Sequence, residues 1–390
     1  MLIARAPVRI SLAGGGTDLP AYYNQFGGVV INTTIDKYFY VFLRVYDGDS
    51  LQIASSDYST FYRQNPNLEP DDSDAPIEGT LKLPRTVLNH FGVARGLSMF
   101  LASEIPPGTG LGSSSTVTVA IIKALSTAIG EPLTKGDLAE LACHIEMEQM
   151  AMPIGKQDQY AAAYGGLNEI TFSASGCTVK PLDVSWDTRQ QLQDNLMLFF
   201  TGHSRNSADI LREQTHASRK SSSSTVEALH RVKAMVEDVR ACFVGGDLTA
   251  FGQLLHENWM QKKLFAPGIS NALIDDSYDT ARKLGAVGGK IKAAGGGGFL
   301  MLYCPRASQP AVTDALEAKG LLRMDYKFDS TGARVLMNAG LSIQPAMLRP
   351  SSGWNGAENR RSASAPARSA PLRGVGRGDH APTLASEAAS

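Results

Sequence analysis

Cysteine is scarce in this sequence, and the few cysteines are far apart. Cys143, Cys177, Cys242 and Cys304 are the only 4 in 390 residues, and none of them forms a C-x-x-C pair. Such spacing argues against a zinc site and against the disulfide framework of a small secreted domain. We therefore expect reduced thiols in the core of a cytoplasmic protein.

The chain also lacks an excess of charge and a long apolar run. Its formal net charge is −1 at pH 7, and charged residues make up 19% of it. No strong positive field favours nucleic acid, and no uncharged apolar stretch approaches the length of a membrane span. Met1–Arg5 opens without the long apolar segment of a signal peptide. We expect no nucleic-acid partner and no membrane partner, whereas the oligomeric state cannot be predicted.

Two common phosphate-binding signatures are absent too. A Walker A loop needs a lysine after its last glycine, but Gly112 is followed by Ser113. A dinucleotide fingerprint needs G-x-G-x-x-G/A, and Ser113 again stands at the required position. No acidic strand end follows at the expected distance either. These absences argue against a P-loop enzyme and a dinucleotide-dependent oxidoreductase.

The glycine-rich stretch that fails to match those signatures still has features that favour binding of a polyphosphate. It reads Pro107-Gly108-Thr109-Gly110-Leu111-Gly112-Ser113-Ser114-Ser115 and precedes a helical pattern. Its glycines leave the backbone uncovered, and the first amides of a helix have no intrahelical partners. The helix dipole favours an anion there, and the serine hydroxyls could reach phosphate oxygens or a hydrated Mg²⁺. A similar turn can also be only a capped helix start, so other motifs must decide.

Apolar periodicity and turn residues predict a chain that alternates strands and helices. We expect strands near 2–12, 28–32, 38–45, 51–63, 97–104, 167–172, 177–182, 195–201, 321–328 and 333–338. We expect helices near 81–91, 116–129, 135–151, 206–215, 225–244, 247–263, 271–284 and 310–319. Residues 343–390 are rich in Ser, Pro, Ala, Arg and Gly, and we predict a disordered tail.

Three glycine-rich motifs follow one another in the chain, at 7–18, 107–115 and 292–299. In this order they resemble the three motifs of the GHMP small-molecule kinases, which include galactokinase, homoserine kinase and mevalonate kinase. The third motif departs from the family pattern, because Ala293-Ala294 stands where a Gly-Ala pair is expected. The resemblance covers about residues 1–340.

Further stretches resemble the sugar-1-kinases typified by D-glycero-alpha-D-manno-heptose 7-phosphate kinase. They are Thr34–Tyr38, Ile154–Tyr160, His256–Lys263 and Gly288–Lys290. The resemblance implies an α+β fold of two domains, an N-terminal domain like domain 2 of ribosomal protein S5 over 1–190 and a ferredoxin-like domain over 191–342. It also implies ATP-dependent transfer to the anomeric hydroxyl of a heptose 7-phosphate.

The resemblance assigns roles to single residues. Asp158 is the expected catalytic base and Arg9 the cation beside it. ATP is expected at Pro107, Gly108, Thr109, Gly110, Leu111, Gly112, Ser113, Ser114 and Ser115. The sugar or sugar phosphate is expected at Gly16, Thr17, Asp18, Lys37, Lys156, Arg205, Gly296 and Gly297. Lys262 or Lys263 is a further candidate cation for a phosphate on the sugar.

The cofactor implied is Mg²⁺, held by Ser114 and an acidic residue of the predicted helix 135–151. Helical phasing alone does not choose between Glu146 and Glu148, since Glu148 lies nearer the apolar stripe. Alignment to the family through Pro153 favours Glu146.

Two other functions stay open from the sequence. One is a GHMP kinase for an unphosphorylated or unusual sugar, similar to a fucokinase or galactokinase. The other is a catalytically silent binding protein of the same fold. Arg9, Ser114, Glu146 and Asp158 together argue against silence, because a binding protein has no need of a catalytic base.

Overall fold

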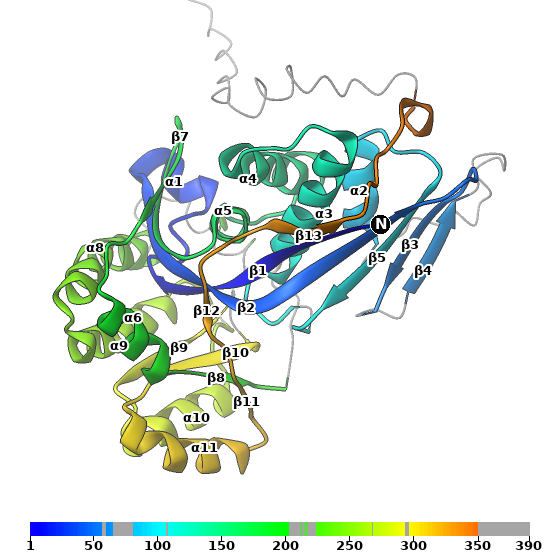
Figure 1. Ribbon diagram of the computed structural model, residues 1–390. Helices are drawn as coiled ribbons and strands as arrows, with labels where there is room; N and C mark the ends of the chain where they lie inside the picture. The colour runs from blue at the N-terminus through cyan, green and yellow to red at the C-terminus, as the bar shows by residue number, and fades with distance from the viewer. Residues whose placement is uncertain are drawn as a thin grey trace, which may run out of the picture.

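The structure is a computed structural model, drawn in Figure 1, and it describes residues 1–56, 60–64, 81–106, 108–202, 212, 215–216, 224–266, 268–292 and 296–349. These residues form a nine-stranded and a four-stranded sheet with helices packed on both. The predicted α+β class is therefore confirmed. Within the described ranges, no helix has both the length and the apolar character needed to cross a bilayer.

The nine-stranded sheet is built around two long antiparallel strands, β1 (Leu2–Ala13) and β2 (Gly28–Val45). β2 is one continuous strand, where the sequence predicts two. The far side of β2 pairs with β5 (Leu97–Ser103) near its end and with β6 (Leu167–Ser173) near its start. The sheet is completed by β3 (Leu51–Ser55), β4 (Thr60–Gln64) and β7 (Gly176–Pro181).

Helices cover the inner face of this sheet, as Figure 1 shows for α2 (Lys82–His90), α3 (Ser113–Ile129) and α4 (Lys135–Cys143). The apolar positions of α3 recur at helical spacing, and Val119, Ile122 and Leu125 are fully buried. The helix ends at Gly130 with φ 89°. Thr134 caps α4 by accepting from the Asp137 N–H, as its spacing predicts. Two short helices, α1 (Pro20–Phe26) and α5 (Gln157–Tyr164), follow glycine-containing loops.

The four-stranded sheet has the antiparallel order β11 (Leu322–Met324), β8 (Leu196–Phe200), β10 (Phe299–Tyr303), β9 (Gly288–Ile291). One face packs on α10 (Ala272–Lys283) and α11 (Gln309–Glu317). The other face packs on α8 (Ser224–Gly245), α9 (Leu248–Lys262) and the apolar side chains of β1. β1 is a strand of the nine-stranded sheet, and its apolar side chains also pack on the four-stranded sheet. Its C-terminal end therefore lies where the two sheets meet.

Several elements differ from the sequence-based expectation. The predicted helix 135–151 becomes a π-helix at His144–Gln149, and α6 (Trp186–Asn195) was not predicted. β12 (Phe328–Asp329) and β13 (Arg334–Asn338) pair with the first sheet, although they fall in the range predicted for the second domain. The boundaries 1–190 and 191–342 stay a prediction.

The predicted tail does not begin at 343. Ile343 is buried, Pro345–Met347 form a short 3₁₀ helix, and Leu348 bridges to Val93. These apolar side chains add to the core under α2, which offsets the cost of ordering them. The rest of the predicted tail, 350–390, lies outside the described residues, as do 206–211 of the helix expected at 206–215.

Candidate active site

A cavity of about 470 Å³ opens where the end of β1, the start of α3 and the edge of the second sheet meet. Loops after β1, before α3 and before α5 form one side, and α9 with β9 forms the other. Its polar lining includes Arg9, Ser11, Asp18, Ser113, Ser114, Ser115, Gln157, Asp158, Asn258, Lys262, Lys290 and Lys292. The three predicted motifs thus approach one another, and each of them contributes residues to the lining.

The glycine-rich loop before α3 presents backbone rather than side chains to the cavity. Gly108, Gly110 and Gly112 have φ of 72°, 85° and 80°, a left-handed conformation that only glycine adopts at little cost. α3 begins at Ser113, three residues earlier than its periodicity predicts, so the serines form its first turn. The free amides and the dipole at this end favour an anion.

The hydroxyls of that first turn differ in exposure. Ser114 is exposed toward the cavity, whereas Ser113 and Ser115 are buried. The Ser115 hydroxyl interacts with the buried Glu146 carboxylate through a hydrogen bond. Ser114 is therefore the hydroxyl that a bound ligand reaches most easily.

Arg9 joins this loop to Asp158. Its Nε donates to Oδ1 of Asp158 at 2.8 Å, and its Nη2 lies 2.6 Å from the same oxygen. Its Nη1 donates to the carbonyl of Gly110 at 2.8 Å. The Arg9 guanidinium is thus held by Asp158 on one side and by Gly110 on the other. The Asp158 carboxylate lies beside Gly112, because a Cβ added to Gly112 would come 3.1 Å from Oδ2 of Asp158.

Asp18 lies next to Asp158 at the cavity wall. Its Oδ1 accepts from the Gly16 N–H at 3.0 Å and its Oδ2 from the Gln157 N–H at 3.4 Å. Burial, and then the charge of Asp158, raises the pKa of Asp18. Gly155 is required here, because a Cβ on it would lie 1.9 Å from Oδ2 of Asp18.

Glu146 lies behind the first turn of α3, in the π-helix. Its carboxylate is fully buried and accepts from the hydroxyl of Thr118 at 2.7 Å and from the side-chain amide of Gln159. Burial raises the pKa of Glu146 to about 7, although these hydrogen bonds oppose the shift. Glu148 points the other way, is exposed, and contacts His144 at 2.9 Å. The extra residue of a π-turn, frequent at functional sites, therefore turns Glu146 inward.

Three lysines enter the cavity from the second sheet and α9. Lys290 Nζ donates to the Leu12 carbonyl at 2.9 Å and to Oδ1 of Asn258 at 3.2 Å. Lys292 Nζ donates to the Ser11 carbonyl, and Lys262 Nζ to the Ile291 carbonyl at 2.8 Å.

The pKa of each lysine is lowered, because burial removes water from the ammonium and the neighbouring cations repel it. The pKa of Lys262 falls to about 7, and those of Lys290 and Lys292 lie well below their usual value. The lysines therefore form a site that an anion would stabilise.

Three buried polar atoms at the cavity have no hydrogen-bond partner within the described residues. They are Ser11 Oγ, Asn258 Nδ2 and Gln157 Oε1. Buried polar atoms are rarely left unpaired, so these three atoms at the cavity wall are candidates for contacts with a ligand.

The sequence did not single out these three residues, nor Lys290 and Lys292 as cations. The spacing of the two lysines in Gly288–Lys292 was the available signal, since residues two apart on a strand face the same side.

Five predicted substrate residues do not line the cavity, although the structure describes them. The Thr17 hydroxyl is fully buried and contacts the carbonyls of Gly14 and Val29. Lys156 turns away and contacts Glu140 at 3.2 Å. Lys37 lies along β2, outside the lining.

The third motif is in close contact with the second one. A Cβ on Gly298 would come 2.4 Å from the Thr109 carbonyl, so the two loops are in close contact. Gly296 donates its N–H to the Ile269 carbonyl at 2.9 Å, and neither Gly296 nor Gly297 is in the cavity lining. Pro107 and Arg205 lie outside the described residues.

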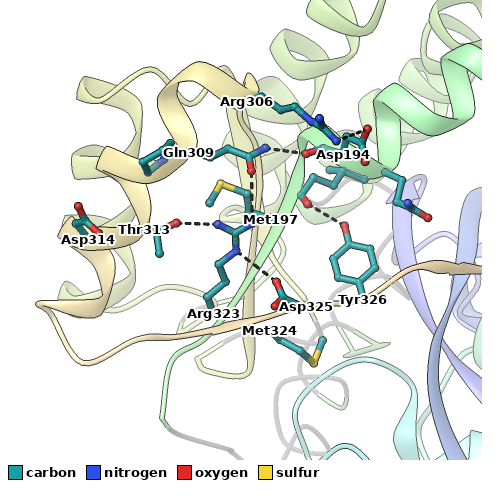
Figure 2. Close-up of a pocket in the computed structure, with 13 residues that line it drawn as sticks. Asp194, Met197, Arg306, Gln309, Thr313, Asp314, Arg323, Met324, Asp325 and Tyr326 are labelled. Atoms are coloured by element: carbon teal, nitrogen blue, oxygen red, sulfur yellow. Dashed lines mark hydrogen bonds and ion pairs between the residues drawn. The ribbon is translucent and has the colours of Figure 1, made fainter.

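A second hollow, of about 570 Å³, lies in the second sheet between β8, β11 and α11 (Figure 2). Arg306 pairs with Asp194 at 2.7 Å. Arg323 donates to Thr313 Oγ1 at 3.0 Å and to Gln309 Oε1 at 3.4 Å. Both arginines therefore already have partners in the protein.

Comparison with known families gives two matches. Residues 79–166 match the family model of the GHMP kinases N terminal domain, and residues 232–321 match that of the GHMP kinases C terminal domain. The first match contains the loop before α3 together with Glu146 and Asp158. The second contains Lys262, Lys290 and Lys292.

Individual proteins are similar over most of the chain. It is 29% identical over 332 residues to D-glycero-alpha-D-manno-heptose 7-phosphate kinase of Campylobacter jejuni, covering 85% of this chain and 97% of that protein. It is 26% identical to L-fucokinase/L-fucose-1-P guanylyltransferase of Bacteroides fragilis, covering 76% of this chain but 34% of that longer protein. The solved structure of a D-glycero-D-manno-heptose 1-phosphate kinase from Bacteroides thetaiotaomicron superposes with a TM-score of 0.70 at 27% identity. The superposition covers 87% of this chain and 99% of that one.

Proposed function

Because this chain belongs to the GHMP kinases, we propose that it transfers the γ-phosphoryl group of ATP to the anomeric hydroxyl of a heptose 7-phosphate. The product would be the 1,7-bisphosphate. The broader assignment, a phosphotransferase acting on a sugar hydroxyl, follows from the family and its sugar-kinase relatives. The observation that supports the chemistry best is the Arg9–Asp158 pair, held at the free amides of α3.

The loop before α3 would hold the triphosphate of ATP. Its glycines allow the backbone to approach the phosphates, and the amides of Ser113, Ser114 and Ser115 open the helix. Amides fixed in this way stabilise the charge on the transferring group without rearranging during the reaction. No lysine of the Walker type is needed for this arrangement.

Asp158 would accept the proton of the anomeric hydroxyl. That oxygen then forms a bond to the γ-phosphorus while the bond to the bridging oxygen breaks and ADP leaves. Arg9 orients the carboxylate through Oδ1 and brings positive charge close to the phosphoryl group. Asp18, with its carboxylate at the cavity, would accept hydrogen bonds from neighbouring sugar hydroxyls and so hold the ring in line.

A divalent cation fits the oxygen donors beside α3. Ser114 lines the cavity, whereas Glu146 lies behind the first turn of α3, outside the lining, and accepts from Thr118 and Gln159. A hydroxyl and a carboxylate are the hard ligands that Mg²⁺ prefers, and we infer that Glu146 would turn to the cation when it binds. Within the part of the chain that the structure describes, no three His, Cys, Asp or Glu side chains cluster to bind a metal. The phosphates of ATP would therefore complete the coordination. When bound, Mg²⁺ neutralises charge on the β- and γ-phosphates.

Phosphorus NMR with ATP and Mg²⁺ over a panel of sugars and sugar phosphates tests this proposal. We expect a new phosphate resonance coupled to the anomeric proton, formed fastest from a heptose 7-phosphate. Faster turnover of sugars without a distal phosphate would point instead to a kinase similar to the fucokinase relative. Absence of transfer to every sugar would contradict the proposed activity.

A further inference from the structure

The proposed acceptor carries a phosphate at the end opposite its reacting hydroxyl, and two of the cations predicted for that phosphate do not reach the cavity. Lys156 is turned toward Glu140, and Lys37 lies outside the cavity lining. Arg205 lies outside the described residues, whereas Lys262 lines the cavity as predicted. A phosphate dianion in a cavity needs two or more donors of positive charge nearby, so Lys262 alone is not enough.

Lys290 and Lys292 have the properties that such a subsite requires. Lys290 is on β9 and Lys292 directly follows its last residue, both line the cavity, and their exposed fractions are only 3% and 2%. Within the described residues, neither forms an ion pair with a carboxylate; their ammonium groups donate to the carbonyls of Leu12 and Ser11 and to Asn258. An ammonium buried without a counter-charge is costly, and a bound anion would offset that cost.

Unpartnered polar atoms stand at the same place. Asn258 is 5% exposed, and its Oδ1 accepts from Lys290 while its Nδ2 has no partner. Ser11 is 9% exposed, its carbonyl accepts from Lys292, and its Oγ has no partner. Phosphate oxygens accept hydrogen bonds from groups of this kind, an amide N–H and a hydroxyl beside two ammonium groups.

The lysines contact β1 further along the strand than Arg9 does. Arg9 contacts Gly110 in the loop before α3, whereas the lysines contact β1 at Ser11 and Leu12. Ser11 is two residues further along the strand, which corresponds to ~7 Å. From there the chain continues to Gly16 and Asp18, where the sugar is expected. The lysines therefore lie between Arg9, whose charge reaches both of them, and the loop where the sugar is expected.

We propose that Lys290 and Lys292, together with Asn258 and Ser11, form the subsite for the distal phosphate of the acceptor sugar. This inference rests on the proposed sugar-kinase function and adds the residues that select a phosphorylated substrate. Lys262, on α9, borders the subsite, and its amine adds positive charge when it is protonated.

Isothermal titration of the full chain with two sugars tests the subsite. The ligands are D-glycero-D-manno-heptose 7-phosphate and the same heptose without its phosphate, each added in the presence of Mg²⁺ and a saturating non-hydrolysable ATP analogue. For Lys292→Met we expect the Kd of the phosphorylated sugar to rise about 30-fold or more. The Kd of the free heptose should change by less than about threefold, and the preference of the wild type for the phosphorylated sugar should disappear.

Lys263→Met is the matched control, since it removes a neighbouring lysine that contacts Asp275 at 3.6 Å and does not line the cavity. It should leave both Kd values unchanged. If Lys292→Met fails to fold, as judged by its thermal melt, Lys290→Met carries the same test.

Two outcomes would overturn the inference. Weaker binding of the ATP analogue, with unchanged binding of the sugar phosphate, would place the lysines at the triphosphate. Equal weakening of both sugars, or of neither, would show that the lysines do not recognise a distal phosphate. In these cases the wild type would still transfer phosphate in the NMR assay, whereas failure of the proposed function would abolish transfer itself.

Discussion

Two hollows of this protein, the cavity beside α3 and the hollow under α11, differ in how their polar groups are satisfied. The cavity beside α3 is the smaller, about 470 Å³ against about 570 Å³ for the hollow under α11. In the larger hollow, Arg306 and Arg323 already have partners (Figure 2). In the smaller one, Ser11, Asn258 and Gln157 keep buried atoms without partners in the described structure.

This difference identifies the functional cavity better than size does. A hollow whose charges are internally paired is stable as it is, and a ligand would have to break contacts to bind. Buried unpaired groups cost free energy that a ligand can offset. The same reasoning explains why lysines with lowered pKa gather in the cavity beside α3. We therefore expect substitutions there to change catalysis and substitutions under α11 to change little.

The largest effect is expected for Asp158→Asn. The amide cannot accept the proton of the sugar hydroxyl, so kcat should fall by about 10²- to 10⁴-fold. Binding of a non-hydrolysable ATP analogue should persist, as measured by titration. Asp194→Asn, in the second hollow, is the matched control and should keep kcat within about twofold. Near-normal turnover by Asp158→Asn would show that Asp158 is not the catalytic base.

Glu146→Gln should come next, with the apparent affinity for Mg²⁺ lowered about 10- to 100-fold. Because burial raises the pKa of Glu146 to about 7, the wild type should also lose Mg²⁺ affinity as the pH falls from about 8 to about 6. The variant should not show this pH dependence. Titration of activity with Mg²⁺ at several pH values measures both, and Glu148→Gln serves as the exposed control. An equal pH dependence in Glu146→Gln would argue against a metal role.

Lys262 should make stability depend on pH. The pKa of Lys262 in the folded protein is about 7 against 10.5 for the free side chain, with Arg9, Lys290 and Lys292 facing it. Between these values the unfolded chain binds more protons, so the free energy of unfolding rises with pH, at most ~1.4 kcal/mol per unit. Lys262→Met should show a smaller slope in urea melts from about pH 7 to about pH 9. Equal slopes of unfolding free energy against pH in the wild type and in Lys262→Met would contradict a buried, uncharged amine at Lys262.

Gly155→Ala should disturb the sugar end of the cavity. The new Cβ would lie 1.9 Å from Oδ2 of Asp18, so the loop must move at a cost of ~1–3 kcal/mol. The melting temperature should fall and the KM for sugar should rise. Gly245→Ala, where a Cβ meets no atom within 4 Å, is the control. Unchanged KM and stability in Gly155→Ala would show that Asp18 does not depend on this contact.

The smallest effect is expected for Arg306→Ala. Its pair with Asp194 is exposed on the arginine side, so the free energy of unfolding should change by ~0–1 kcal/mol. The kcat/KM for sugar and for ATP should stay within about twofold of the wild type. A large loss of activity would mean that the second hollow takes part in function, which would break the contrast between the two.

Local sequence signals predicted much of the framework. β1, α3 and the loop between β5 and α3 follow from strand alternation, helical spacing and glycine, and the family resemblance placed Arg9, Asp18 and Asp158 at one cavity. Their catalytic roles remain predictions. The choice of Glu146 over Glu148 needed that resemblance, because the π-helix that turns Glu146 inward leaves no signal in residue periodicity.

Tertiary packing determined what the sequence could not predict. Thr17 looks like a substrate ligand, yet the start of β2 covers it and takes its hydroxyl for backbone contacts. Lys290 and Lys292 look like solvated strand residues until α9 and β1 pack over β9. For the two lysines, this burial depends on segments that lie hundreds of residues apart in the sequence.

A crystal structure of the full chain with Mg²⁺, a non-hydrolysable ATP analogue and heptose 7-phosphate tests the account most directly. We predict the triphosphate on the amides at 110–115, the anomeric hydroxyl at Asp158, and the distal phosphate within hydrogen-bond distance of Lys290 and Lys292. Binding of either ligand in the hollow under α11, with the cavity beside α3 left free, would contradict it.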